Sequence, residues 1–168
     1  MASKEKCKII ILPPRRWKEL RALRLESLKE EPVAFGASVV EESASPKSKF
    51  VDRLKSKQTL CAEVNGVLVG LIGFRPGKRK RTRHVVEVGP FYVCKVRRRN
   101  GVGSKLLKAA LMLAKKRHAE KVRLEVNKNS RAAIAVYKKF GFKKVGALKK
   151  EFKIKGKYYD ILVLEKFI

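Results

Sequence analysis

Apolar residues occur along the chain both in short runs and at helical intervals, and the two patterns predict different elements. Runs rich in Val, Ile, Leu and Phe favour strands, because such side chains pack well on a pleated sheet. These runs occupy residues 7–12, 58–64, 67–74, 84–96 and 122–126, and two more begin at Phe142 and Lys157. Asn65-Gly66 separates the second run from the third. Because both positions tolerate positive φ, this dipeptide predicts a two-residue hairpin turn.

Apolar residues at helical spacing predict four helices. These helices span residues 15–30, a segment that starts at Ser45-Pro46, residues 101–118, and residues 130–140, where Gly141 supplies a C-cap. Residues 31–38 interrupt the helical spacing and predict a structured loop. The resulting order is βααβββαβαββ. It predicts one α/β domain over residues 1–168, with a mixed twisted sheet of about seven strands flanked by about four helices.

The composition agrees with a single folded domain. The 168 residues are 45% hydrophobic, which is enough to form a core and argues against a disordered chain. No apolar run approaches the roughly 18 residues of a membrane helix. The apolar residues 9–12 are too few for the core of a signal peptide. We therefore expect a cytoplasmic protein without a membrane span.

Several classes of site are excluded by what the sequence lacks. Cys7, Cys61 and Cys94 form no Cys-x-x-Cys pair, and the chain has only two histidines. We therefore expect neither a disulfide framework nor a bound metal. The sequence contains no Gly-x-Ser-x-Gly elbow and no Walker-type loop, which argues against the common hydrolases and NTPases.

The segment with the clearest chemistry is the turn between the strand at 84–96 and the helix at 101–118. Arg97, Arg98 and Arg99 precede Gly101 and Gly103, which open the helix. Glycines let several backbone N–H groups point at one centre, and the helix adds the positive end of its dipole. This pattern is typical of a phosphate-binding turn, although a tight strand-to-helix turn on a basic surface explains the same residues.

Two motifs in this order resemble the GNAT superfamily of N-acetyltransferases. Residues 98–103, with the sequence RRNGVG, match the family's pyrophosphate loop, R/Q-x-x-G-x-G/A. Residues 133–142, with the sequence AIAVYKKFGF, resemble the family signature A-I-x-L-Y-x-K-x-G-F. The chain departs from the family at Ser130, where members often carry Asn; Ser130 remains a candidate helix cap. The resemblance covers nearly the whole chain and implies a GNAT-like fold.

The resemblance also implies acetyl-CoA as the donor and assigns residues that bind it. The backbone of the glycine turn would hold the pyrophosphate, and the strand end before it would pair with the pantetheine. The residues implied in binding are Phe91, Tyr92, Val93, Arg98, Arg99, Asn100, Gly101, Val102, Gly103, Ser104 and Ser130. Phe91 and Val93 also fit ordinary core alternation.

The reaction implied by the resemblance needs a base and an acid. An amine acceptor is mostly protonated at pH 7 and must lose a proton before it attacks the thioester. Glu87 lies where some members carry the general base, although a strand Glu that faces solvent, or one that pairs with Arg83, fits the same position. Tyr137 occupies the family position of the acid for the CoA thiolate, and the Val93 N–H would polarise the thioester carbonyl. An acyl-Cys94 intermediate is disfavoured, because no activating His lies nearby in the sequence. Tyr158 and Tyr159 are expected either to line the acceptor pocket or to pack on the sheet.

The charge of the chain leaves its partners open. The chain contains 43 Lys and Arg but only 15 Asp and Glu, which gives it a net charge of +28. Such a field favours non-specific association with nucleic acid or ribosomes, but it also fits a solvated surface. Seven of the acids lie between Glu19 and Asp52, which favours a cationic acceptor, either a small-molecule amine or a protein amine. An acetyltransferase that acts on aminoacyl-tRNA or a ribosomal protein, and a non-catalytic CoA-binding module, remain alternatives. A homodimer through the C-terminal strands is also an expectation.

Overall fold

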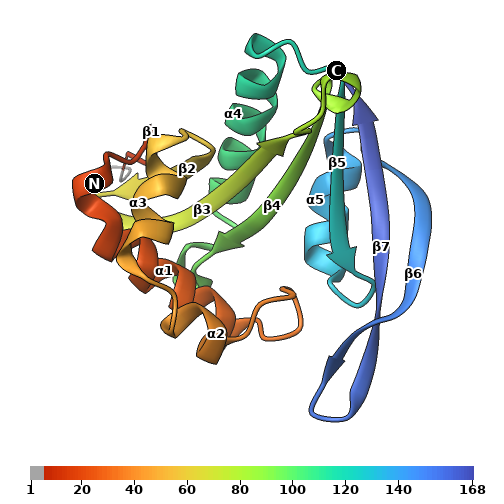
Figure 1. Ribbon diagram of the computed structural model, residues 1–168, viewed down its shortest axis with the longest axis horizontal. Coiled ribbons are helices and arrows are strands. Elements are labelled where there is room, and N and C mark those ends of the chain that lie inside the picture. Colours follow the sequence, from red (N-terminus) through yellow and green to blue (C-terminus); the bar gives the residue numbers. More distant parts are fainter. Residues whose placement is uncertain (1–5) are drawn as a thin grey trace.

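The computed structural model describes residues 6–168, and its strands form one seven-stranded sheet in the order β1-β2-β3-β4-β5-β7-β6 (Figure 1). The strands are β1 Lys8–Ile11, β2 Thr59–Val64, β3 Val67–Pro76, β4 Val85–Val93, β5 Lys121–Asn127, β6 Lys143–Ile154 and β7 Lys157–Phe167. The α-helices are α1 Trp17–Glu30, α2 Val39–Ser43, α3 Lys47–Lys55, α4 Val102–Lys116 and α5 Arg131–Lys139. The predicted mixed α/β architecture is confirmed.

Helices cover both faces of the sheet, because successive strand residues point to opposite faces. On one face Leu60 belongs to a buried cluster with Leu106 of α4. On the other face Cys61 belongs to a cluster with Leu20 of α1 and Phe50 of α3. Both clusters are built on the same central strands, so the positions of α1, α3 and α4 are fixed relative to one sheet.

The hairpin between β2 and β3 forms as the sequence predicts. Asn65 and Gly66 have φ angles of 50° and 81°, and Val64 pairs directly with Val67. Positive φ at both central residues is the requirement of a type I′ turn, which matches the twist of the flanking strands.

The helix count is one higher than predicted. α2, a short helix after the predicted loop, begins with a capping box. The Ser38 side chain accepts a hydrogen bond from the Glu41 N–H at 3.2 Å, and the Glu41 carboxylate accepts one from the Ser38 N–H at 2.7 Å. The Ser-x-x-Glu spacing signals this helix in the sequence, and the prediction overlooked it because the helix has only five residues.

The predicted strand at residues 84–96 ends earlier than expected. β4 stops at Val93, and Lys95–Arg97 form a short 3₁₀ helix that leads to the glycine turn. The apolar run is therefore longer than the strand, because Val96 lies in this 3₁₀ helix and is largely exposed.

β4 and β5 separate halfway along their length, and this separation positions the site. The two strands pair in parallel only from Val85–Lys121 to Val88–Leu124. Beyond this point β4 remains paired with β3, with a bulge between Val88 and Phe91, while β5 remains paired with β7 as far as Asn127. The last residues of β4 therefore have a sheet neighbour on one side only.

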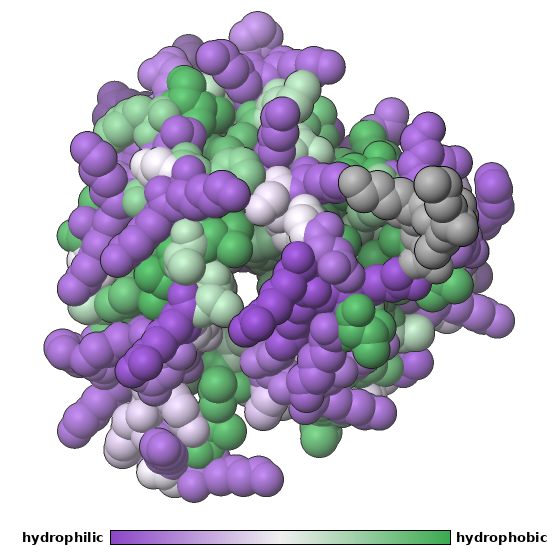
Figure 2. All heavy atoms as spheres, turned by 180° about the vertical axis from the view of Figure 1, so that it is seen from behind, coloured by the Kyte–Doolittle hydropathy of each residue, from purple (hydrophilic) through white to green (hydrophobic). Residues whose placement is uncertain are grey.

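The surface of the molecule is dominated by hydrophilic side chains. Viewed from behind, they cover most of the visible face, and an opening passes through the molecule near its centre (Figure 2). In residues 6–168, no helix has the length and apolar character needed to cross a membrane.

Candidate active site

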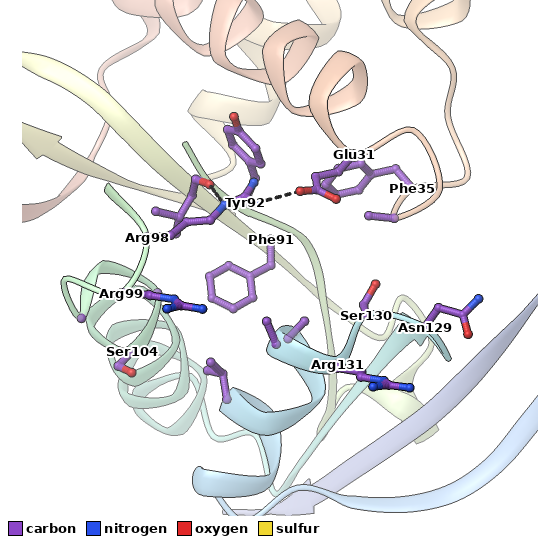
Figure 3. Close-up of a pocket in the computed structure, with 17 residues that line it drawn as sticks. Glu31, Phe35, Phe91, Tyr92, Arg98, Arg99, Ser104, Asn129, Ser130 and Arg131 are labelled. Carbon is purple, nitrogen blue, oxygen red and sulfur yellow. Dashed lines mark hydrogen bonds and ion pairs between the residues drawn. The ribbon is translucent and has the colours of Figure 1, made fainter. Parts of the chain in front are cut away.

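A cavity of about 720 Å³ lies where β4 and β5 separate. Its walls come from the end of β4, the turn that opens α4, the start of α5 and the loop after α1 (Figure 3). The residues predicted from sequence that line it are Phe91, Tyr92, Val93, Arg98, Arg99, Gly101, Gly103, Ser104 and Ser130. The fold thus brings together, at one cavity, segments as far apart in the sequence as Glu31 and Val136.

The glycine turn presents main-chain N–H groups at the start of α4. Arg99 and Gly101 adopt positive φ angles of 63° and 74°, and Gly101 is the N-cap. The Lys105 N–H donates to the Gly101 carbonyl at 3.0 Å, so the N–H groups of the first turn before it have no intrahelical acceptor. Together with the helix dipole, these groups form a site suited to an anion such as a diphosphate.

Gly103 keeps the space between this turn and β4 open. A Cβ atom at this position would lie 3.4 Å from the Phe91 ring and 3.8 Å from the Val93 side chain. A longer side chain would occupy the space in front of the strand end. The glycine therefore lets a ligand pass from the turn to the edge of β4.

The free edge of β4 offers main-chain hydrogen bonds to an extended ligand. The Cys94 N–H donates to the Val69 carbonyl of the neighbouring strand at 2.9 Å. Because consecutive N–H groups of a strand point to opposite sides, the Val93 N–H points away from β3, into the gap beside β5. An extended ligand can pair with such an edge in the way that an added strand does.

The Arg98 side chain braces the cavity wall. Its Nε donates to the Val93 carbonyl at 2.9 Å, and its Nη1 donates to the Glu31 carboxylate at 2.8 Å. The guanidinium also lies 5.8 Å from the centre of the Tyr92 ring. In Figure 3 the Arg99 side chain extends into the cavity, whereas Arg98 lies against the wall. Arg98 therefore joins the glycine turn to the loop after α1.

Ser130 stands at the N-cap position of α5 but does not cap it with its side chain. The prediction of a side-chain cap is wrong, because the Ser130 ψ of 65° differs from the extended value usual at an N-cap. The Ser130 hydroxyl instead points toward the side of the cavity where Phe35 lies (Figure 3). Ser130 lines both this cavity and the next one.

A second cavity of about 460 Å³ adjoins the first. Glu87 and Tyr137, the predicted base and acid, line this second cavity and not the first. The two cavities share Ala34, Phe35, Phe91, Ser130 and Ala133. Two ligands, one bound in each cavity, could therefore meet at these shared residues. A transfer between two substrates requires this arrangement.

Tyr137 is held by aromatic contacts. Its ring centre lies 5.9 Å from that of Phe91 and 5.8 Å from that of Phe142, and the residue is only 5% exposed. Burial raises the pKa of the Tyr137 hydroxyl well above its ordinary value near 10. The hydroxyl therefore stays protonated at neutral pH and is suited to donate a hydrogen bond.

Glu87 is held between two arginines on neighbouring strands. Its carboxylate oxygens lie 2.7 Å from Arg75 Nη2 and 3.6 Å from Arg123 Nη2. The sequence analysis considered Arg83 as a partner of Glu87. The structure pairs Glu87 with Arg75 and Arg123 instead, because these two residues lie directly opposite it in the sheet register. These ion pairs fix the carboxylate at the wall of the second cavity.

Asn127 is a site residue that the sequence analysis did not single out. Its Nδ2 donates to the Val33 carbonyl at 2.9 Å, and its Oδ1 accepts from the Asn129 N–H at 2.9 Å. It is 1% exposed and lies at the end of β5. A buried Asn at a strand end, followed by a turn, is the available signal. Asn127 ties the loop after α1 to β5, across the gap.

Two other expectations change with the structure. Tyr158 and Tyr159 line neither cavity; Tyr158 is 50% exposed and packs against Lys150 and Lys153, while Tyr159 packs against Lys157. Phe152, from the neighbouring strand, lines the second cavity instead. Burial raises the pKa of the Cys94 thiol, which makes it a weak nucleophile and agrees with the expectation of no acyl-cysteine.

The acids of the N-terminal region are engaged in contacts, which weakens the sequence argument for a cationic acceptor. Glu19 and Glu63 pair with Arg16, and Glu31 pairs with Arg98. The Tyr92 hydroxyl lies 2.8 Å and 2.7 Å from carboxylate oxygens of Glu26 and Glu30.

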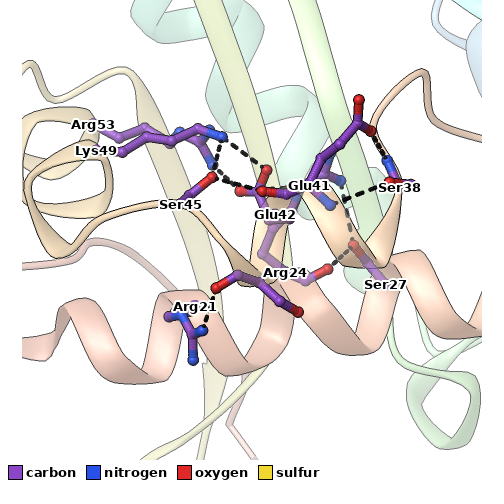
Figure 4. A network of polar contacts seen from close by, with 10 residues as sticks. Arg21, Arg24, Ser27, Ser38, Glu41, Glu42, Ser45, Lys49 and Arg53 are labelled. Carbon is purple, nitrogen blue, oxygen red and sulfur yellow. Dashed lines mark hydrogen bonds and ion pairs between the residues drawn. The ribbon is translucent and has the colours of Figure 1, made fainter.

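Glu42 joins three helices at the second cavity (Figure 4). It is 2% exposed, and its oxygens lie 3.1 Å from Lys49 Nζ, 3.2 Å from Arg53 Nη1 and 3.9 Å from Arg24 Nε. The net result of burial, which raises the pKa of Glu42, and of these cations, which lower it, is a lowered pKa. The carboxylate is therefore ionised at neutral pH and holds α1, α2 and α3 together.

We predict that Glu42→Gln lowers the free energy of unfolding by about 3 kcal/mol at pH 7, because it leaves the buried Arg24 without its carboxylate and removes the ion pairs of Lys49 and Arg53. A carboxyl group with a lower pKa in the folded state stabilises the fold above its unfolded pKa, near 4, and loses this effect as pH falls through the folded value. The difference in the free energy of unfolding between wild type and variant should therefore become smaller below about pH 4. Urea unfolding at several pH values measures this difference. Glu151→Gln, at an exposed position, is the control; a difference that stays constant with pH would contradict the prediction.

The comparisons with known proteins agree with this geometry. The family described as acetyltransferase (GNAT) matches residues 17–142. An N-alpha-acetyltransferase from Sulfurisphaera tokodaii is 38% identical over 113 residues, which cover 60% of this chain and 66% of that protein. The chain thus matches just under two thirds of that relative's length.

Solved structures share the fold. A GNAT-family acetyltransferase from Streptococcus pneumoniae superposes with a TM-score of 0.87 at 26% identity, covering 97% of this chain and 100% of that chain. A Salmonella typhimurium protein solved with acetyl-CoA as its cofactor has a TM-score of 0.84 at 16% identity, covering 96% and 94%. The family match spans most of the chain and includes the glycine turn and Tyr137. The chain therefore belongs to the GNAT acetyltransferase family.

Proposed function

We propose that the protein transfers an acetyl group from acetyl-CoA to a primary amine, by direct attack while both substrates are bound. The observation that carries this proposal is the junction of the two cavities. The phosphate-binding turn and the free edge of β4 open on the first cavity, and Glu87 and Tyr137 face the second. Family membership supports acetyl-CoA as the donor.

The first cavity fits the donor. The N–H groups from Arg99 to Ser104 would bind its diphosphate, and the free edge of β4 from Phe91 to Val93 would pair with its extended arm. Acetyl-CoA supplies a thioester, whose carbonyl carbon is the electrophile. The Val93 N–H, which points into the gap, would donate to the carbonyl oxygen as charge develops on it.

Glu87 is the proposed base. An alkyl amine has a pKa near 10, so most of it is protonated at pH 7 and cannot attack. The Glu87 carboxylate, held by Arg75 and Arg123, would take a proton from the amine directly or through a water. The neutral nitrogen then forms the C–N bond to the carbonyl carbon and loses one further proton as the amide forms, which balances the proton that the departing sulfur takes up.

Tyr137 is the proposed acid. As the C–S bond breaks, its hydroxyl would donate a hydrogen bond to the departing sulfur, which finally carries the proton. The raised pKa of Tyr137 favours hydrogen bonding over transfer of the proton before the bond breaks. The overall change is one C–N bond formed, one C–S bond broken, and a free thiol released.

The acceptor is proposed to be the α-amine of a protein or peptide, or a small-molecule amine. The name of the Sulfurisphaera tokodaii relative supports the α-amine. The comparisons do not favour the alternatives, which are an acetyltransferase that acts on aminoacyl-tRNA or a ribosomal protein and a non-catalytic CoA-binding module. Association with nucleic acid, a homodimer and a cytoplasmic location stay predictions.

We further propose that the whole chain acts as one acetyltransferase domain. The matched family region ends at Phe142, but β7 lies between β5 and β6 in the same sheet. Ile161, on β7, lines the second cavity. The segment after the match thus completes both the sheet and the proposed acceptor site.

The donor site is tested by Gly103→Ala. Alanine is the better helix former by about 1 kcal/mol, so the variant should be at least as stable as the wild type. Its Cβ would project toward Phe91 and Val93, where the donor is proposed to pass, so CoA binding should weaken several-fold. Calorimetric titration with CoA measures the affinity, and Gly146→Ala, at a position with open space, is the control. If the wild type shows no saturable binding of CoA, the proposed function is wrong.

Tyr137→Phe tests the acid. In residues 6–168 the Tyr137 hydroxyl has no hydrogen-bonded partner, so its removal should not destabilise the fold. We expect kcat for thiol release with acetyl-CoA and a panel of amines to fall by about 10²-fold or more, while CoA affinity is kept. Tyr158→Phe, which lies outside both cavities, should leave kcat unchanged. Equal turnover in the Tyr137 variant would rule out this role.

Glu87→Gln tests the base. The variant should lose about 10²-fold or more in turnover at pH 7, and part of the loss should be recovered as pH rises and the amine deprotonates in solution. The pH profile of kcat/KM measures this. Glu125→Gln is a matched control, because Glu125 lines the same cavity without the two arginine contacts of Glu87. If Glu125→Gln shows the larger loss, the roles of the two carboxylates are reversed.

A further inference from the structure

The second cavity has a wall with more positive than negative charge. Arg24 of α1, together with Lys49 and Arg53 of α3, lines this cavity around the single carboxylate of Glu42 (Figure 4). We call Arg24, Lys49 and Arg53 the cationic wall. Arg24 and Glu42 are buried, whereas Arg53 is partly exposed and Lys49 is half-exposed, so within this cluster three cations share one carboxylate.

Arg24 is the least satisfied member of the cationic wall. It is 7% exposed, and its Nε is buried without a hydrogen-bond partner among the described residues. Its Nη1 donates a hydrogen bond to the Ser27 hydroxyl at 3.3 Å, which is long. Buried charges in proteins are ordinarily paired and hydrogen-bonded, because desolvation is costly. Burial, together with repulsion from Arg53, lowers the pKa of Arg24 to about 10 despite the nearby Glu42, and it remains charged at pH 7.

Glu87 and Glu125 also line this cavity, but no ion pair among the described residues joins either of them to the cationic wall. On the opposite wall Glu87 is already paired with Arg75 and Arg123. The Phe35 ring lies 4.5 Å from the Arg24 guanidinium carbon and contributes only a cation–π contact. The cavity volume of about 460 Å³ is within the range of sites for small ligands. The excess charge therefore faces the space where the acceptor is proposed to bind.

We propose that the acceptor is an amine that also carries a carboxylate, and that the cationic wall binds this carboxylate while the amine lies toward Phe91 and Tyr137. This inference rests on the proposed function and deepens it. Two sources share the chemistry: a free acidic amino acid, and a peptide whose N-terminal amine is close to an acidic side chain. Hydrogen bonds from Lys or Arg to a carboxylate in a partly dry cavity are stronger than neutral ones.

Matched acceptors test the inference. Glutamate is compared with glutamine, and peptides with Glu at the second position are compared with otherwise identical peptides with Gln. Thiol release from acetyl-CoA gives kcat/KM for each. We expect the acidic member of at least one pair to be used about tenfold better or more. A preference in the first pair indicates a free amino acid, and a preference in the second indicates a peptide N-terminus.

Two variants of the cationic wall test whether it causes the preference for acidic acceptors. Lys49 is half-exposed, and its replacement leaves Glu42 paired with Arg24 and Arg53, so Lys49→Gln should fold. The ratio of kcat/KM between acidic and neutral acceptors should fall toward one in Lys49→Gln and in Arg53→Gln. Lys55→Gln is the control, since it makes the same charge change on the same helix at an exposed residue outside both cavities. In Lys55→Gln this ratio of kcat/KM should equal that of the wild type.

The outcomes separate this inference from the proposed function. Equal use of acidic and neutral amines would overturn the acidic acceptor and leave the acetyltransferase proposal intact. An acidic preference that persists in both Lys49→Gln and Arg53→Gln would overturn the assignment to the cationic wall. If no amine of any kind releases thiol, the proposed function fails, and this inference fails with it.

Discussion

The site depends on one interruption of backbone hydrogen bonding, the loss of pairing between β4 and β5 beyond Val88 and Leu124. A continuous parallel ladder would fill the gap between the strands and leave no free N–H on β4. The bulge between Val88 and Phe91 turns the end of β4 while β3 keeps it in the sheet. The Val93 N–H then points into open space, and the turn that follows brings the N-terminus of α4 to the same place. The proposed binding of the donor and the proposed activation of its carbonyl would therefore both depend on a single departure from regular sheet geometry.

An open gap in a sheet must be braced, and the bracing is polar. Arg98 connects the glycine turn to Glu31, and Asn127 connects the end of β5 to the Val33 carbonyl. These two contacts hold the same loop from opposite sides of the cavity. Glu42 then fixes the helices that follow the loop. Buried charged groups contribute little net stability compared with apolar packing, but they fix geometry and leave charge available to a ligand.

Local signals in the sequence predicted local structure well. Asn65-Gly66 predicted its turn because the two residues alone meet the requirement for positive φ. The spacing of residues 98–103 predicted the turn at the cavity, because helix start and glycine positions are short-range properties. Ser38-x-x-Glu41 was an equally local signal that was missed, since the helix it starts is so short. The partners of Glu87 and the cationic wall could not be predicted. They depend on strand register and on how three helices meet at Glu42, and no spacing along the chain encodes either. The family resemblance placed Glu87 and Tyr137 as candidates, and the structure adds that both face the second cavity.

The brace formed by Arg98 has a consequence for the solution behaviour of the protein. A strand with unpaired groups along one side can recruit a strand from a neighbouring molecule and start aggregation. Arg98 Nε occupies the Val93 carbonyl, and α5 and the glycine turn stand close on either side. These groups narrow the space beside the free part of β4, which favours a slender ligand over a polypeptide strand with its side chains. The same contacts that shape the cavity therefore also limit pairing between the free part of β4 and a strand of another molecule.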